Sequence, residues 1–150
     1  MTTIYLEDIQ PGQIYGSPTY AVTVENIKEF AAQWDPQEFH LDEAAAQDSF
    51  FQGLAASGWH TAAATMRLLV TGEFHPVNGL IGAGFEELKW HRPVRPGDVL
   101  SVRTEVLEVR PMRSKPELGL VKVRVTTLDA DGLPVQMFIP TLVVRARNPA

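Results

Sequence analysis

The sequence predicts an α+β fold in which an antiparallel β-sheet wraps around one buried helix. The first reason is the segment from Gly58 to about Thr71, where apolar residues cover most faces of a helical pattern, as expected of a helix inside the core. The second is the change after residue 80 to alternating apolar and polar residues, which is typical of strands. Short turns join these segments, so neighbouring strands should run antiparallel.

Length and composition limit the function classes. The 150 residues predict a single domain spanning residues 1–150, large enough to bury about 68–70% of its unfolded surface. No run of about 18 apolar residues could span a membrane, and the start lacks a secretory signal, so we expect a soluble cytoplasmic protein. The absence of cysteine excludes disulfides and thiolate metal sites. A formal net charge of −5 argues against nucleic acid as a partner and leaves small molecules and proteins.

The first half of the chain should be mostly helical after a short entry. Residues 6–13 form an expected turn around Pro11-Gly12, and residues 17–22 a short strand. Thr23 is the expected N-cap of a helix that ends before Asp35-Pro36, since a residue preceding proline avoids the helical region. Asp42 should cap a second short helix. The first helix has five residues spaced for one apolar face: Val24, Ile27, Phe30, Ala31 and Trp34.

The second half should form four long strands. Arg95-Pro96-Gly97-Asp98 suits a type II turn, and residues 129–132 another tight turn. Pro140 should make the last strand an edge or mark a bulge, because proline cannot donate to the sheet ladder. The strands are expected at Leu80–Trp90, Val99–Val109, Gly119–Leu128 and Val135–Ala146.

Asp35, His40 and Gly58 have the chemistry of a small acid/base site. Asp35 lies at the exit of the first helix, and a turn from there to His40 would let the two side chains converge. Gly58 opens the buried helix, whose first N–H groups would stabilise an oxygen that becomes anionic. The alternative for the pair is a carboxylate bonded to a histidine for structure alone.

Three motifs in this order resemble the MaoC-like dehydratases, the family that includes (R)-specific enoyl-CoA hydratases. The residues are Phe30-Ala31 with Asp35, His40 and Asp42, then Ser57-Gly58 before a long helix, then the segment WHRPVRPGD at residues 90–98. The resemblance implies the hotdog fold, usually as dimers, with no cofactor and no metal. It implies reversible syn addition of water to a trans-2-enoyl thioester of CoA or an acyl carrier. Asp35 and His40 would then share the water, and the Gly58 N–H would receive the thioester carbonyl.

Two departures from the family pattern concern the site. The usual loop Asp-x-Asn-Pro-x-His is here Asp35-Pro36-Gln37-Glu38-Phe39-His40, so the proline has moved and Glu38 adds a carboxylate. A helix hydroxyl of some members, about eight residues after the glycine, falls on Met66. Thr61 or Thr65 could replace it.

Substrate binding is expected from residues near the trio and from one basic cluster. Phe39, Ser57 and Trp59, with Phe50 and Phe51 nearby, suit an apolar acyl pocket, although the aromatic residues could equally be core. Arg113 and Lys115, close to Arg110, could bind the phosphates of the substrate, and a solvated loop is the alternative.

A metal site is a weaker hypothesis. Asp35, His40, Asp42 and His60 are possible ligands, but no known ligand spacing supports them, and we expect none. His60, His75 and His91 are expected to have structural roles.

Two other functions share the fold or the ligand. A hotdog thioesterase would release free CoA, and a catalytically silent acyl-binding or partner subunit would turn nothing over. We expect a homodimer, or an oligomer of dimers, joined edge to edge along residues 80–90, because an uncovered edge strand needs a partner.

Overall fold

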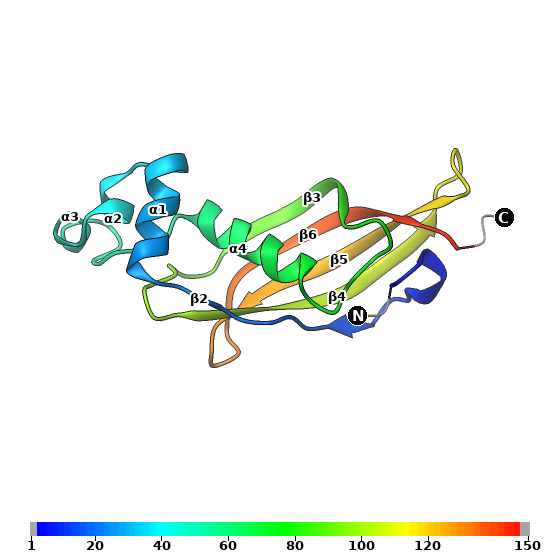
Figure 1. Ribbon diagram of the computed structural model, residues 1–150, viewed down its shortest axis with the longest axis horizontal. Coiled ribbons are helices and arrows are strands. Elements are labelled where there is room, and N and C mark those ends of the chain that lie inside the picture. Colours follow the sequence, from blue (N-terminus) through cyan, green and yellow to red (C-terminus); the bar gives the residue numbers. More distant parts are fainter. Residues whose placement is uncertain (1–2, 148–150) are drawn as a thin grey trace.

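The structure is a computed structural model that describes residues 3–147. A six-stranded antiparallel sheet packs against the long helix α4 (Gly58–Val70), and the helices α1, α2 and α3 gather at one end of the molecule (Figure 1). The sheet order is β1-β4-β5-β6-β3, with β2 also paired to β4. The predicted α+β class and hotdog arrangement are confirmed. The strands are β1 (Ile14–Tyr15), β2 (Tyr20–Ala21), β3 (Ile81–Trp90), β4 (Val99–Pro111), β5 (Leu118–Leu128) and β6 (Pro134–Arg145).

The core lies between the inner face of the sheet and α4. Alternate residues of β5 point inward, and Val121, Val123 and Val125 are completely buried there. On the helix, Ala64, Leu68 and Leu69 are buried against them. The alternation found in the sequence therefore matches the side of each strand that faces the helix.

The helix α4 is less covered than the sequence predicts. Trp59 is 55% exposed, and Met66 and Val70 are also exposed, so an apolar stripe runs along the side of α4 that this chain leaves open. Trp59 and Met66 are seven residues apart and lie on the same face of the helix. The all-round apolar pattern thus combines two faces, one buried by the sheet and one uncovered.

The helix α1 (Val24–Trp34) begins and ends as predicted. The Thr23 hydroxyl accepts the Asn26 N–H, and the Asn26 side chain accepts the Thr23 N–H, which is a reciprocal capping pair. Ile27 and Ala31 are buried. Trp34, expected on the apolar face, is instead 71% exposed, because the helix extends past the core at its last turn.

The N-terminal segment contains more structure than the predicted turn. A 3₁₀ helix covers Leu6–Asp8, and β1 pairs with β4 through Ile14 and Tyr15. The expected strand at residues 17–22 is reduced to β2, two residues long.

Pro140 does not lie in an edge strand. It belongs to β6, which has β5 on one side and β3 on the other, so the edge interpretation is wrong. The ladder accommodates the missing N–H by skipping pairs: β5 and β6 pair at Lys122↔Thr141 and next at Val125↔Phe138. On the other side, the pairing of β6 with β3 has register shifts between Gly82 and Gly84 and between Glu86 and Lys89. The edge strand next to β6 is therefore β3.

In the described part of the chain, no helix has the length and apolar character needed to cross a membrane.

Replacing Thr23 with alanine should lower the free energy of unfolding by about 1 kcal/mol, because the first turn of α1 loses its cap. Thr23→Ser keeps a hydroxyl and should retain most of the stability. Urea denaturation of the three proteins measures the difference, and equal midpoints for wild type and Thr23→Ala would show that the cap contributes nothing.

Candidate active site

A cavity of about 570 Å³ opens between the end of α1, the short helix α2 (Glu38–Leu41), the start of α4 and the end of β3. It contains all three residues of the predicted acid/base site. Its lining residues are Asp35, Gln37, Phe39, His40, Phe50, Phe51, Ala56, Gly58, Trp59, Thr61, Trp90, His91, Arg92, Pro93 and Val94.

His40 is held on a helix and not on the predicted turn. Pro36 follows the end of α1, and after Gln37 the chain closes a new helical turn in which the Asp42 N–H bonds the Glu38 carbonyl. His40 is buried there, and its Nδ1 lies 2.6 Å from the Ala55 carbonyl oxygen. A carbonyl can only accept, so Nδ1 carries the proton and donates it. This fixes the ring and leaves Nε2 facing Asp35.

Asp35 lies 3.3 Å from His40, measured from Oδ2 to Nε2. As the C-cap of α1, it donates its backbone N–H to the Ala31 carbonyl. Partial burial acts to raise the pKa of its carboxyl. Hydrogen bonds from the Ser57 hydroxyl and the Gln37 amide, together with His40, outweigh that effect and hold the pKa below its usual value. Asp35 is therefore an ionised carboxylate at neutral pH.

Gly58 supplies a backbone N–H at the start of α4. Ser57 caps the helix: its Oγ accepts the Trp59 N–H, and its carbonyl accepts the N–H groups of His60 and Thr61. Within residues 3–147 no group accepts the Gly58 N–H, and Gly58 is one of the residues that line the cavity. A free N–H at the positive end of a helix stabilises an oxygen that gains negative charge.

The position of Gly58 tolerates no side chain. A Cβ there would lie 2.6 to 2.9 Å from three ring carbons of Trp90, well inside contact distance. Trp90 therefore packs flat against the helix start, and its ring forms the cavity wall next to the free N–H.

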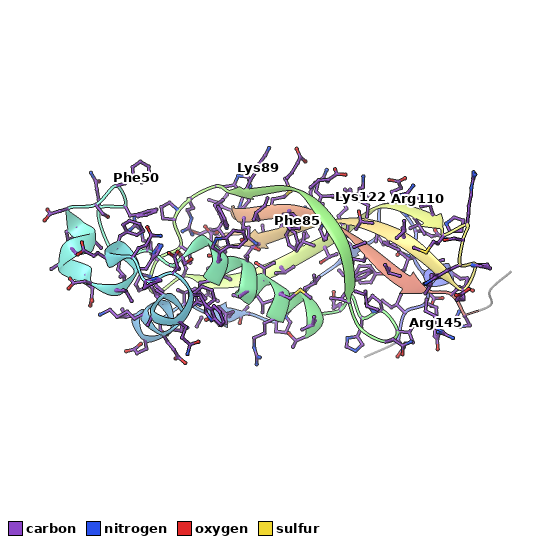
Figure 2. All side chains as sticks on the ribbon, turned by 90° about the horizontal axis from the view of Figure 1, so that it is seen from above. Phe50, Phe85, Lys89, Arg110, Lys122 and Arg145 are labelled. Atoms are coloured by element: carbon purple, nitrogen blue, oxygen red, sulfur yellow. The ribbon has the colours of Figure 1, made fainter. Side chains whose placement is uncertain are left out.

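Four of the predicted substrate-binding residues, Phe39, Phe50, Phe51 and Trp59, line the cavity, whereas Ser57 is fully buried and does not line it. The Phe39 ring meets the His40 ring edge-on, with 4.6 Å between the ring centroids. The centroids of the Phe39 and Phe51 rings are 5.1 Å apart. The rings of Trp59 and Trp90 meet edge-to-face, with 5.3 Å between their centroids. Phe50 projects from the end of the molecule that carries the helices (Figure 2). An aromatic wall of this kind is suited to an apolar ligand.

The structure places Arg113 and Lys115 far from this cavity. Both lie in the hairpin between β4 and β5, and β4 has thirteen residues, or about 40 Å of strand, between that hairpin and the turn near the site. Arg110, beside the hairpin, is at the opposite end from Phe50 (Figure 2). These two residues therefore lie away from the cavity of their own chain, and their assignment to substrate phosphates stays a prediction.

Residues 90–94 are the part of the site that the sequence did not identify. Trp90, Pro93 and Val94 line the cavity, whereas the sequence motif that contains them suggested a turn and a family resemblance but no site residue. The feature of the sequence that could have indicated this wall is Trp90 at the end of an expected strand, three residues before Pro93. Of the two proposed replacements for the missing helix hydroxyl, Thr61 lines the cavity, whereas Thr65 is bonded inside the core.

The four side chains considered for a metal do not converge. Asp42 caps α3 (Glu43–Gln47) by accepting the Ala45 N–H, and His60 Nε2 lies 2.9 Å from the Tyr20 hydroxyl. Among residues 3–147 no group of three histidine or acidic side chains has the arrangement of a metal site.

Comparison with known proteins identifies the family. Residues 8–128 match the family model described as MaoC like domain. The chain belongs to this family. A MaoC-like dehydratase from Rhodospirillum rubrum is 48% identical with a TM-score of 0.93, the match covering 97% of this chain and 99% of that one.

Two further proteins are similar to this chain at lower sequence identity. The (R)-hydratase PhaJ1 from Pseudomonas aeruginosa is 26% identical with a TM-score of 0.74, covering 97% of this chain and 88% of that one. The uncharacterized protein YdeM of Bacillus subtilis is 32% identical over 122 residues, which are 81% of this chain and 85% of the relative.

The pKa of Asp35 should rise in Ser57→Ala, because the carboxylate loses a hydrogen-bond donor. Ser57→Thr keeps the hydroxyl and should restore the low pKa, and Ser101→Ala, on β4, should leave it unchanged. Carboxyl carbon NMR of labelled aspartate follows the titration. An unchanged midpoint in Ser57→Ala would show that Ser57 does not set the charge state of Asp35.

Proposed function

We propose that this protein is a hydratase that adds water reversibly to trans-2-enoyl thioesters, or removes it from 3-hydroxyacyl thioesters. The observation that carries the proposal is the Asp35–His40 pair, 3.3 Å apart, in a cavity that also contains the free Gly58 N–H. Hydration of a conjugated thioester requires an activated water, a proton for the neighbouring carbon, and an acceptor for enolate charge.

The pair divides the proton transfers. One water held between Asp35 and His40 Nε2 gives its oxygen to C3, and one of the two side chains takes its proton. A proton from the pair then forms the new C–H bond at C2, so the product gains one water in total. Because Nδ1 of His40 is committed to Ala55, only Nε2 takes part in the exchange. A single water on one side of the double bond makes the addition syn.

The Gly58 N–H receives the thioester oxygen. As the C3–O bond forms, charge moves to this oxygen, and a backbone donor at a helix start stabilises it without moving. The aromatic residues Phe39, Phe51 and Trp90 shape the apolar space around the acyl group. The family relation to a dehydratase and to an (R)-hydratase supports this chemistry.

We also propose that two copies pair through β3 and the open side of α4. The strand β3 is a free edge with unpaired backbone groups, and Phe85 on it is 59% exposed. The apolar stripe of α4, formed by Trp59, Met66 and Val70, is also uncovered. A two-fold pairing would cover both at once and bring the partner next to the cavity wall.

Asp35→Asn and His40→Ala should each lower the rate of crotonyl-CoA hydration by about 10²-fold to 10⁴-fold, the contribution of a proton-transfer group. Loss of the thioester absorbance measures turnover. The matched controls are Asp131→Asn, in the turn between β5 and β6, and His75→Ala, before β3, which should keep wild-type rates. Wild-type turnover in either site variant would contradict the acid/base assignment.

The same assay with a thiol reagent separates the alternatives. Loss of the alkene without free thiol supports hydration. Free thiol without loss of the alkene would replace the proposal with a thioesterase, and calorimetric binding of acyl-CoA with no turnover would replace it with a silent acyl-binding subunit.

Light scattering at micromolar concentration should give a mass near twice that of the 16.6 kDa chain. An obligate interface of this kind buries more than about 1,000 Å² in total. Phe85→Glu places a charge on the proposed interface and should lower the mass, whereas Leu133→Glu, at an exposed turn, should not. A wild-type mass near that of one chain would refute the pairing.

A further inference from the structure

Trp90 is joined to the core by a chain of buried polar side chains. Its indole N–H donates to Gln136 Oε1 at 2.8 Å, and Gln136 Nε2 donates to Thr65 Oγ1 at 3.1 Å. Thr65 Oγ1 also lies 2.6 Å from Thr127 Oγ1. Gln136, Thr65 and Thr127 are each 0% exposed. This hydrogen-bond chain reaches from the middle of the core to the cavity wall.

The donor and the acceptor of every hydrogen bond in this row of side chains are determined. The single hydroxyl hydrogen of Thr65 is donated to the Thr61 carbonyl at 2.8 Å. Thr65 must therefore accept from both Thr127 and Gln136. With its NH₂ group on Thr65, Gln136 turns its oxygen to the Trp90 N–H. Turning the amide over would break both bonds, so only one orientation of Gln136 satisfies the chain.

The residues form one row across the sheet. Gln136 on β6 is the cross-strand partner of Trp90 on β3 and of Thr127 on β5. Thr127 is paired with the buried Val102 of β4, and Val125, two residues before Thr127 on β5, is fully buried. A polar row in such a core stabilises less than well-packed apolar side chains unless every group is satisfied. Here every side-chain nitrogen and oxygen of the row has at least one hydrogen-bond partner, and the outcome is a defined position for Trp90.

We propose that Trp90 is a wall that positions the substrate thioester against the Gly58 N–H, and that Gln136 is a positioning residue that holds this wall through Thr65. The inference rests on the proposed function. The ring carbons of Trp90 lie against Gly58, so a shift of the ring changes the space in which the carbonyl oxygen meets the N–H. The wall is built by the sheet, whereas the N–H is supplied by the helix, and the hydrogen-bond chain connects the two.

The alternative is that the row only fixes how α4 packs on the sheet. Both roles would lower the free energy of unfolding when a member is removed. They differ in two respects. One is whether removing a member of the row changes the hydrogen exchange of the Trp90 indole N–H, and the other is whether mutations of Gln136 and Trp90 act independently on catalysis.

The first experiment measures hydrogen exchange at the Trp90 indole N–H. The chain has three tryptophans, and the Trp90 signal is assigned by its loss in Trp90→Phe. Thr65→Val removes the acceptor of Gln136 without touching Trp90, and it should raise the exchange rate about 2-fold to 10-fold, the effect of losing one hydrogen bond. Thr104→Val is the matched control, a buried threonine on β4 outside the chain. Exchange equal to wild type in Thr65→Val, after correction for global unfolding, would refute the connection.

The second experiment is a double-mutant cycle on kcat for crotonyl-CoA. Gln136→Leu should lower kcat about 10-fold to 100-fold, as expected for a misplaced reacting group. In a Trp90→Phe background, where the indole N–H is already gone, the same change should have a much smaller effect. Independent effects of the two mutations, or an unchanged kcat in Gln136→Leu, would refute the positioning role.

A failure of the proposed hydratase function can be distinguished from a failure of the positioning role of Gln136. If wild type hydrates no enoyl thioester, that function fails, whereas the exchange experiment still tests the hydrogen-bond chain. The cycle is then measured on the dissociation constant of butyryl-CoA, an unreactive saturated thioester, and the same coupling is expected.

Discussion

The buried segment Leu54–Ser57 is the constraint on which the whole site depends. The Ala55 carbonyl fixes the His40 ring, and the Ala56 N–H bonds the Val94 carbonyl at 2.8 Å. Ser57 caps α4 and bonds Asp35. One extended segment therefore sets the positions of the imidazole, the carboxylate, the helix N–H and the loop after β3. Because its backbone groups are buried and bonded, it cannot shift without leaving polar atoms unsatisfied.

Arg95 holds the chain on the other side of this segment. Its guanidinium donates to the carbonyl oxygens of Phe51, Gly53 and Leu54. Its own position is set by the type II turn, in which the Arg95 N–H bonds Asp98. Asp98 also pairs with Arg92, which joins Asp129 in the next turn. The predicted turn at residues 95–98 thus positions Arg95, which holds the loop containing Phe50 and Phe51 at the cavity.

The sequence patterns predicted those helices and strands whose formation depends on residues close together in the chain. The capped start of α1, the helix opening at Gly58 and the alternating strands follow from neighbours within a few residues. The differences between expectation and structure depend on strand order and strand length. Pro140 suggested an edge because nothing in the sequence shows that β3 pairs beyond β6. Arg113 and Lys115 were placed with the substrate by charge, although strand length separates them from the site. Trp90 was missed because its role depends on Gln136, 46 positions away.

The loop between Asp35 and His40 brings the two side chains together by a path that follows from the position of its proline. Pro36 directly follows Asp35, so α1 ends with the carboxylate as its cap, and α2 begins after Gln37. The residue between them then has a use, since the Gln37 amide donates to Asp35 at 2.5 Å and helps to keep it ionised. Glu38 is exposed and does not line the cavity, so the added carboxylate lies outside the site. The moved proline changes the path of the chain between the two side chains while leaving Asp35 and His40 in contact.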